Sequence, residues 1–307
     1  MSLDPGTADV ASPSPATKAT HVVVPVTATA GEAIQTCIDA CLAHLEPNES
    51  GWLATEHPDH LHQTRVSTRR LRALLSLIRP LIRDDPVAMD LKARLRLILA
   101  PLGPARDLDV ALERARDEGR TVADLARLDR ARTAAYAGVR DVLTSAAWQG
   151  VWAELDQWRR SDTWLDHVSA RRDGPARGVT DEALDRRYRR IILAGPHLMR
   201  MSDHALHRIR IEGKKLRYGC QFFDTLYPEA GTVRTEDGEE LSVPVHFAEV
   251  MAGLQDAFGL FNDYAVAERL RTELGLESPA PGERPTRLQC VEAWDRVAAL
   301  PPFWRLT

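Results

Sequence analysis

Two stretches far apart in this chain carry the same pattern of basic and apolar residues. The first runs from His62 to Arg72 and the second from His207 to Arg217, and they align without a gap. Both follow H-x-x-R-x-x-x-B-B-L-R, where B is arginine or lysine. A motif that recurs in this way indicates an internal duplication, which restricts the fold to one built from two related units.

A second match follows each copy of this motif. Residues 102–111 align with residues 258–267 and keep a glycine, an aspartate and a Val-Ala pair at the same offsets. Two motifs in the same order predict halves near residues 30–160 and 180–300. We expect two helical bundles related by a pseudo-two-fold axis.

The composition favours helices over strands. Apolar residues make up 44% of the 307 residues and aromatic residues only 6%, and alanine, leucine and arginine dominate. Apolar periodicity and Pro or Gly breaks predict helices at 30–45, 60–81, 86–99, 105–118, 122–143, 150–159, 180–194, 204–227, 246–258, 262–274 and 285–300. The predicted fold class is all-α.

Two segments depart from the helical pattern. Residues 232–245 carry β-type residues on both sides of Asp237-Gly238, which predicts a small inserted β-hairpin. Residues 1–20 are rich in Ser, Thr, Pro, Ala and Gly, which is typical of a disordered tail. The remaining residues, 21–307, are expected to form a single domain made of the two halves.

Nothing in the sequence indicates secretion or a membrane span. The four cysteines form no CxxC pair, and Cys37 and Cys41 lie one helical turn apart, so we expect buried reduced thiols. The N-terminus lacks a basic region followed by an apolar one, and no apolar stretch is long enough to span a membrane. We therefore expect a cytoplasmic protein without a membrane partner.

The repeated motif places its cations on one helix face. At about 100° per residue, offsets of 0, 3, 7 and 10 fall within an arc of about 80°. Leu71, Leu74, Leu75 and Ile78 point the other way, so each helix can bury an apolar face and display a ladder of cations. The ladder residues are His62, Arg65, Arg69 and Arg72 in the first copy and His207, Arg210, Lys214 and Arg217 in the second.

A basic helix face has two interpretations. It is often a solvated surface balanced by carboxylates on neighbouring helices, and the runs at 92–96 and 186–190 either are of this kind or extend a cationic surface. The first ladder, however, has no acidic residue between His62 and Arg83, and its cation register recurs in the second. Because the net charge is −4, a surface for anions must come from such local concentration. Arginine forks bind phosphate oxygens bidentately, so the ladders indicate a polyanion site.

The acidic and histidine residues of these motifs leave alternatives open. Asp107 and Asp263 either cap a helix start or hold a basic side chain in place, and we prefer capping. Each ladder histidine either donates to a phosphate when protonated, bonds a neighbouring acid when neutral, or is a packed structural residue. His57, His60 and His62 resemble a metal cluster, but we interpret them as incidental residues at a helix entry.

At this point the sequence resembles the CHAD family, the conserved histidine α-helical domain of bacterial proteins. The resemblance rests on the two ladder motifs, on Leu102–Val110, on Leu254-Gln-Asp and on Gly259–Asp263, and it spans nearly the whole chain after residue 25. The sequence departs from the family in two places. Residues 246–254 lack lysines that members often carry, and the 232–245 insertion is unusual and either shields or extends one rim of the site.

The resemblance implies two four-helix bundles around a basic groove or channel. It also implies binding of inorganic polyphosphate and association with polyphosphate granules, by a binding module without catalytic activity. Carried over motif by motif, the implied ligand residues are His62, Arg65, Arg69, Arg72, Arg106, His207, Arg210, Lys214 and Arg217. The acidic ExExK signature of a triphosphate-processing domain, to which relatives are often fused, is absent, so we expect a standalone module.

Two other functions share part of this pattern. An enzyme of phosphate or polyphosphate metabolism would need a P-loop, a nucleophile elbow or an acidic metal cluster, and none is visible. A nucleic-acid-binding module would interleave aromatic residues for base stacking, whereas Tyr218 is the only ring near a ladder. A metal-chelating or purely structural module would show no polyanion affinity. We therefore expect no enzyme, no catalytic residue, no metal, no cofactor and no nucleic-acid partner.

Overall fold

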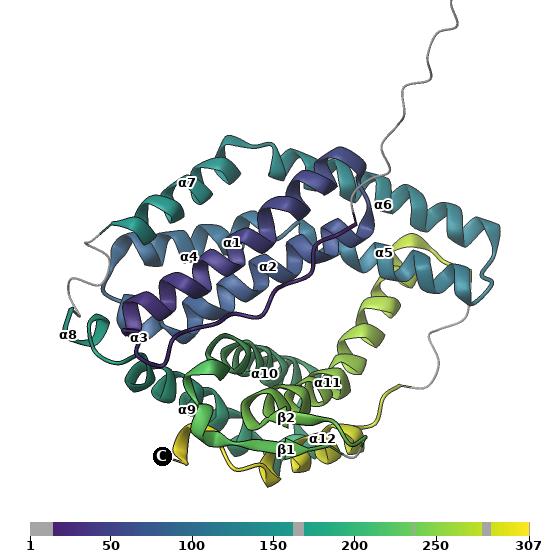
Figure 1. Cartoon of the computed structure of the whole chain (residues 1–307). Coiled ribbons are helices and arrows are strands. Elements are labelled where there is room, and N and C mark those ends of the chain that lie inside the picture. The colour runs from purple at the N-terminus through teal and green to yellow at the C-terminus, as the bar shows by residue number, and fades with distance from the viewer. Residues whose placement is uncertain (1–14, 162–168, 236, 278–283, 307) are drawn as a thin grey trace, which may run out of the picture.

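Helices form almost all of the regular structure in the computed structural model, which describes residues 15–161, 169–235, 237–277 and 284–306 (Figure 1). The α-helices are α1 (Ala30–Thr55), α2 (Pro58–Leu77), α3 (Arg79–Ile82), α4 (Pro86–Ile98), α5 (Leu102–Asp117), α6 (Val122–Leu143), α7 (Ala146–Arg160), α8 (Ser169–Arg172), α9 (Ala176–Ala194), α10 (Asp203–Phe223), α11 (Val243–Leu274) and α12 (Arg287–Ala299). Short 3-10 turns are η2 (Gly195–Arg200), η3 (Asp224–Leu226), η4 (Pro228–Ala230) and η5 (Phe303–Arg305). The predicted all-α class is confirmed.

The helices lie in two groups that meet along α2 and α10. Helix α2 packs on α1, α4 and α5, and α10 packs on α9 and α11, while α2 and α10 also contact each other. In Figure 1 the purple-to-teal helices α1–α7 form one group and the green-to-yellow helices α9–α12 the other. The far end of α11 crosses to the first group, where Leu270 packs with Leu108 and Leu128. The two motif helices therefore lie at the centre of the molecule.

Local signals place α2 so that its apolar face turns inward. His57 caps the helix by accepting from the amide of Asp59, and Pro58 occupies the first turn, where its missing N–H costs nothing. Leu71, Leu74 and Leu75 are at most 1% exposed and belong to the core shared by both groups. The cations of the same helix consequently face the other way, as the periodicity predicts.

The inserted hairpin is confirmed. Strands β1 (Thr232–Arg234) and β2 (Glu240–Ser242) are antiparallel, with Val233 opposite Leu241. Gly238 in the turn has φ of 84°, a left-handed conformation that glycine adopts without steric cost. The residues after Ser242 do not extend the strand, because Ser242 caps α11 instead.

Several predicted helix ends are wrong for identifiable reasons. The helix predicted at 30–45 continues through Pro47 to Thr55 and buries Trp52 completely. The two helices predicted at 246–258 and 262–274 are one continuous helix, α11. Gly259 does not interrupt it, because a single glycine costs a helix only about 1 kcal/mol and Phe258 and Phe261 anchor the flanking residues in the core.

The end of the predicted N-terminal tail lies against α1. Residues 1–14 lie outside the described part of the chain, so their disorder stays a prediction. The backbone amide of Thr17 donates to Asn48 at 3.0 Å, and the Asn48 amide donates back to the Thr17 carbonyl at 2.9 Å. Further along, Val22 and Val24 are buried. The segment from Ala16 to Ala28, called the N-terminal arm below, is therefore part of the folded structure.

Candidate functional site: a basic groove between the two motif helices

A groove with a cavity of about 350 Å³ lies between α2, α4 and α10. Each helix supplies one face: α2 gives Arg69, Arg72, Ala73 and Ser76, α4 gives Met89, Lys92, Ala93 and Arg96, and α10 gives Ile211, Lys214, Lys215 and Tyr218. These twelve residues define the basic groove. Six of them are cationic and none is acidic, so the two ladders do meet on one surface.

The first ladder continues beyond the groove toward α5, where Arg65 packs over Gly103. A Cβ atom added to Gly103 would lie 3.2 Å from Arg65 Nη1, so any larger side chain there would crowd the guanidinium. Burial lowers the pKa of Arg65 to about 10, the charge of Asp107 opposes that shift, and Arg69 adds to it. Arg106 reinforces the lowering and lies 3.8 Å from Asp109.

The second ladder, on α10, packs against α11 in the same way. A Cβ atom added to Gly259 would lie 3.4 Å from Arg210 Nη2, so Arg210 packs over Gly259 as Arg65 packs over Gly103. Burial lowers the pKa of Arg210, and the charge of Asp263 opposes that shift. In each half, the glycine and the aspartate of the downstream motif therefore contact or act on the second basic residue of the ladder, Arg65 or Arg210.

The preference for Asp107 and Asp263 as helix caps is wrong. Asp107 lies in the second turn of α5, whose N-cap is Pro101, and Asp263 lies deep inside α11. Both carboxylates instead act on the ladder arginines. Burial raises the pKa of Asp107, with Arg65 and Arg269 opposing the rise. The alternative, in which the aspartate holds a basic side chain, fits the structure.

Lys214 lies where the two ladders converge. Burial lowers the pKa of Lys214 to about 7, and the charges of Arg69 and Arg210 add to the shift. On the α4 side, burial lowers the pKa of Lys92 to about 8, helped by Arg79 and Lys215. Such shifts arise first from burial of the ammonium group and are increased by neighbouring cations that no nearby acid neutralises.

Acidic partners are confined to the edge of the groove. Glu212 binds Lys215 at 2.7 Å and Arg187 at 2.8 Å, and these contacts lower the pKa of Glu212 to about 2 despite its burial. Arg187 also donates to the backbone of Ser76, which links α9 to α2. Within the dense basic run at 186–190, Arg187 and Arg190 thus support the groove wall through Glu212, whereas Arg189 pairs with Asp185 away from it. Arg94 of α4 turns away to pair with Asp90 and Glu154.

The two ladder histidines lie beside the cations and are half-buried. Burial lowers the pKa of His62, and the charges of Arg106 and Arg69 lower it further. Burial also lowers the pKa of His207, with Arg210 and Lys214 adding to the shift and a hydrogen bond with Asn262 opposing it. Both imidazoles are therefore neutral at pH 7, ready to take up a proton beside an anion.

Arg217, the last predicted ligand, lies elsewhere. Its side chain lines a separate cavity with Arg70, whereas Lys214 on the same cationic face of α10 lines the groove. Two cations of the groove, Lys92 and Arg96, lie outside both motifs. The periodicity of the helix at 86–99 alone does not tell which of its three cations face the groove.

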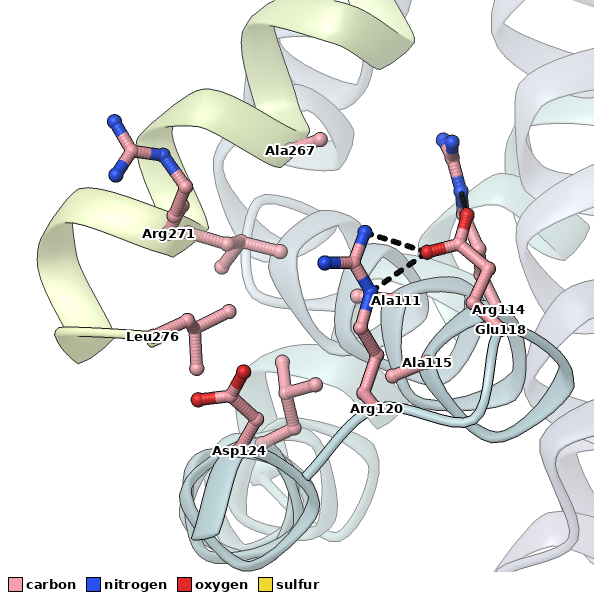
Figure 2. Close-up of a pocket in the computed structure, with 11 residues that line it drawn as sticks. Ala111, Arg114, Ala115, Glu118, Arg120, Asp124, Ala267, Arg271 and Leu276 are labelled. Atoms are coloured by element: carbon pink, nitrogen blue, oxygen red, sulfur yellow. Dashed lines mark hydrogen bonds and ion pairs between the residues drawn. The ribbon is translucent and has the colours of Figure 1, made fainter. Parts of the chain in front are cut away.

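Neither a third, smaller cavity nor the inserted hairpin adds to the basic groove. A cavity of about 80 Å³ lies where α5, α6 and the end of α11 meet, and is lined largely by alanine and leucine (Figure 2). Three arginines also line it: Arg114 and Arg120 donate to Glu118 at 2.6 Å and 2.7 Å, and Arg271 donates to Glu268 at 3.2 Å. No described residue of the hairpin lines the basic groove, so the inserted segment does not form its rim.

The described residues form neither a metal site nor a membrane-spanning helix. Among the described residues, no group of three or more His, Cys, Asp or Glu side chains is placed to hold a metal ion. His57 caps α2, and His60 is buried with Nδ1 3.4 Å from Asn48 Oδ1. The described helices include none that is both long and apolar enough to cross a membrane. All four cysteines are buried and free, as predicted.

Comparison with known proteins agrees with this fold. The family model of the CHAD domain matches residues 36–272, and the chain therefore belongs to the CHAD family. The crystal structure of the CHAD domain from the plant Ricinus communis is similar, with a TM-score of 0.69 and 24% sequence identity, over 92% of this chain and 90% of that chain. No curated protein matches. CHAD domains are associated with polyphosphate-related proteins.

Proposed function

We propose that this chain binds inorganic polyphosphate along the basic groove and the adjoining ladder cations that α2 and α10 place over α5 and α11. The observation that carries the proposal is the convergence of both ladders on Lys214, whose pKa is lowered to about 7. Unneutralised cations held close together repel one another and lower the stability of the fold. A bound polyanion removes this repulsion and forms charge-assisted hydrogen bonds with the cations.

The shape and chemistry of the site suit a flexible phosphate chain. Cations continue from His62 and Arg65 past Lys214 to Lys92 and Arg96. Once the first phosphates are held, each further phosphate meets another cation at little additional orientational cost, so affinity should rise with chain length. Association with polyphosphate granules follows from this affinity and is part of the proposal.

The proposal is for binding without catalysis. The twelve side chains that line the groove are arginine, lysine, serine, tyrosine, methionine, isoleucine and alanine, which stabilise negative charge and include no carboxylate to hold a metal ion or serve as a nucleophile. If the purified protein shortened polyphosphate chains, this part of the proposal would be wrong. A change in chain length is read by gel electrophoresis after long incubation with and without Mg²⁺.

The groove also distinguishes polyphosphate from nucleic acid. Tyr218 is the only aromatic residue that lines it, and its hydroxyl accepts from Arg69 Nε at 3.1 Å, so the ring edge is held in the wall. Stacking of successive bases needs several exposed rings. We therefore expect short DNA or RNA to displace polyphosphate only at a large excess of phosphate groups.

The test is a binding titration with long polyphosphate. Replacing Arg65, Arg69 and Arg72 by alanine should weaken binding at least about 100-fold, since each charge-assisted hydrogen bond contributes about 1.5–3 kcal/mol. The matched control replaces Arg83, Arg160 and Arg189, which are exposed and paired with neighbouring aspartates. The control has the same net charge. Equal affinity of the two triple variants, both folded, would rule out the groove.

A further inference from the structure

A second cavity, of about 330 Å³, also borders α10 and is covered on one side by the N-terminal arm. We call it the arm cavity. Its walls come from the arm, α2, the end of α10 with the first residue of η3, and the first turns of α11. The lining residues are Ala19, Thr20, His21, Arg70, Arg217, Cys220, Gln221, Asp224, Val245, Ala248, Glu249 and Ala252. A cavity of this size holds a small ligand.

Arg70 is the unusual residue in this cavity. It is only 5% exposed, and its Nε is buried with no hydrogen-bond partner in the described part of the chain. No ion pair with a described carboxylate is present for it either; its guanidinium carbon lies 5.0 Å from the ring centroid of Phe222. A buried, unpaired guanidinium is costly, and an anion in the cavity would remove that cost.

A second arginine faces the same space. Arg217 lines the arm cavity, and its Nη1 lies 3.4 Å from the amide oxygen of Gln255, a long and neutral contact. Two guanidinium groups from different helices thus border one small cavity. This is the arrangement that binds a tetrahedral oxyanion through several N–H donors at once.

The lining positions match those of the basic groove in the other half of the sequence. Four residues of α4 line the groove, and each stands a fixed number of positions before Gly103. The four residues of α11 that stand the same numbers of positions before Gly259 line the arm cavity. Arg217 and Gln221 likewise correspond to Arg72 and Ser76. The arm cavity is therefore the second half's version of the groove. The differences are Ala248 in place of Lys92, Glu249 in place of Ala93 and Ala252 in place of Arg96.

These differences change what the cavity can hold. Two cations replace the six of the groove, and two carboxylates, Asp224 and Glu249, stand nearby. His21 of the arm binds Asp224 at 2.7 Å and so closes one end. A long phosphate chain would meet Glu249 and the arm, whereas a compact anion can lie between the two arginines.

We propose that the arm cavity is a separate site for a single phosphoryl group, as free phosphate or as a small phosphomonoester, held by Arg70 and Arg217. The carboxylates at its edge favour a ligand that carries a hydrogen-bond donor next to the phosphoryl group. This site is independent of polyphosphate binding in the groove, so either can exist without the other.

The experiment titrates the full chain with orthophosphate and with O-phosphoethanolamine by calorimetry, before and after saturation with long polyphosphate. Both probes should bind under both conditions, because the two sites are distinct. Tighter binding of O-phosphoethanolamine would assign the site to a phosphomonoester, and equal or tighter binding of orthophosphate would assign it to free phosphate. Absence of binding of both probes at millimolar concentration overturns the proposal.

Variants locate the binding. Arg70→Gln should weaken the small ligand at least about ten-fold, since it removes a charge-assisted donor. Ala252→Phe places a ring in the cavity and keeps both arginines in the sequence, and it should abolish the small ligand while leaving polyphosphate affinity unchanged. It remains informative if Arg70→Gln does not fold. Glu249→Ala should strengthen orthophosphate binding roughly two- to five-fold, because it removes an exposed negative charge from the edge, and it should reduce any preference for O-phosphoethanolamine, whose ammonium group loses a carboxylate partner.

Arg72→Gln separates the two sites. It should weaken polyphosphate and leave the small ligand unchanged, since Arg72 lines only the groove. If Arg72→Gln, and not Ala252→Phe, removed phosphate binding, the phosphate would lie in the groove and the arm cavity would not be a site. Loss of polyphosphate binding alone would leave this proposal standing and overturn the proposed function.

Discussion

Because of Lys214, the proposed binding of polyphosphate should be sensitive to pH in the neutral range. The pKa of Lys214 in the free protein is about 7, well below the usual 10.5, because burial and the charges of Arg69 and Arg210 oppose its protonation. A polyanion favours the charged ammonium and raises that pKa in the complex. Binding above pH 7 therefore takes up a proton, so affinity is highest below pH 7 and falls as the pH rises through that value.

The size of the effect follows from the fraction of Lys214 that is already charged. With a pKa of about 7, about nine-tenths of the lysine is protonated at pH 6 and about one-tenth at pH 8, so its contribution lowers affinity about ten-fold between these values. Lys92, with a pKa of about 8, is half-protonated at pH 8 and adds about a factor of two. The total expected loss is about 20-fold.

The assay compares wild type with Lys214→Arg by titration with long polyphosphate at pH 6, 7 and 8 and constant ionic strength. Arginine stays charged throughout, so the variant should retain only the factor of about two from Lys92. Proton uptake, measured as the dependence of the binding heat on buffer ionisation, should fall in parallel. An equal pH dependence in both proteins would refute the assignment to Lys214.

Three further predictions concern the groove and its support. Gly103→Leu should displace the Arg65 guanidinium and weaken polyphosphate about ten-fold, whereas Gly253→Leu, whose Cβ meets no atom within 4 Å, should not. Glu212→Gln should strengthen polyphosphate binding yet lower the free energy of unfolding by about 1–3 kcal/mol, seen in denaturant titrations, because it removes the partner of Lys215 and Arg187. The stability that Glu212 confers is present above about pH 4.5 and lost as the pH falls toward its pKa of about 2. Finally, removing three ladder arginines should reduce the slope of log affinity against log salt by about two; an unchanged slope would show that those arginines do not contact the phosphates.

Much of the helical framework was predictable because it depends on nearby residues. The cations and leucines of α2 fall on opposite faces by periodicity alone, and the hairpin follows from Asp237-Gly238. The ends of α1 and α11 were not predictable in this way. Pro47 and Gly259 are breaking residues locally, but burial of Trp52 and of Phe258 with Phe261 outweighs their cost.

The roles of the repeated aspartates required the tertiary structure. Sequence offsets alone show Asp107 and Asp263 after a glycine, a position that suits a cap as well as an orienting carboxylate. The structure places each one inside a helix and beside a ladder arginine, so the glycine provides the space and the aspartate the charge. The contact joins residues about 40 to 50 positions apart, which no local pattern encodes.

The sequence by itself determined that two copies of a cationic helix exist, because helix periodicity fixes which residues share a face. Only the tertiary structure decided which cations share a site. In the structure, Lys92 and Arg96 line the groove, Arg94 pairs with Glu154, and Arg217 lines the arm cavity. The physical reason is that a helix face is wide enough to border two cavities, and the neighbouring helix that covers it determines which one each side chain enters.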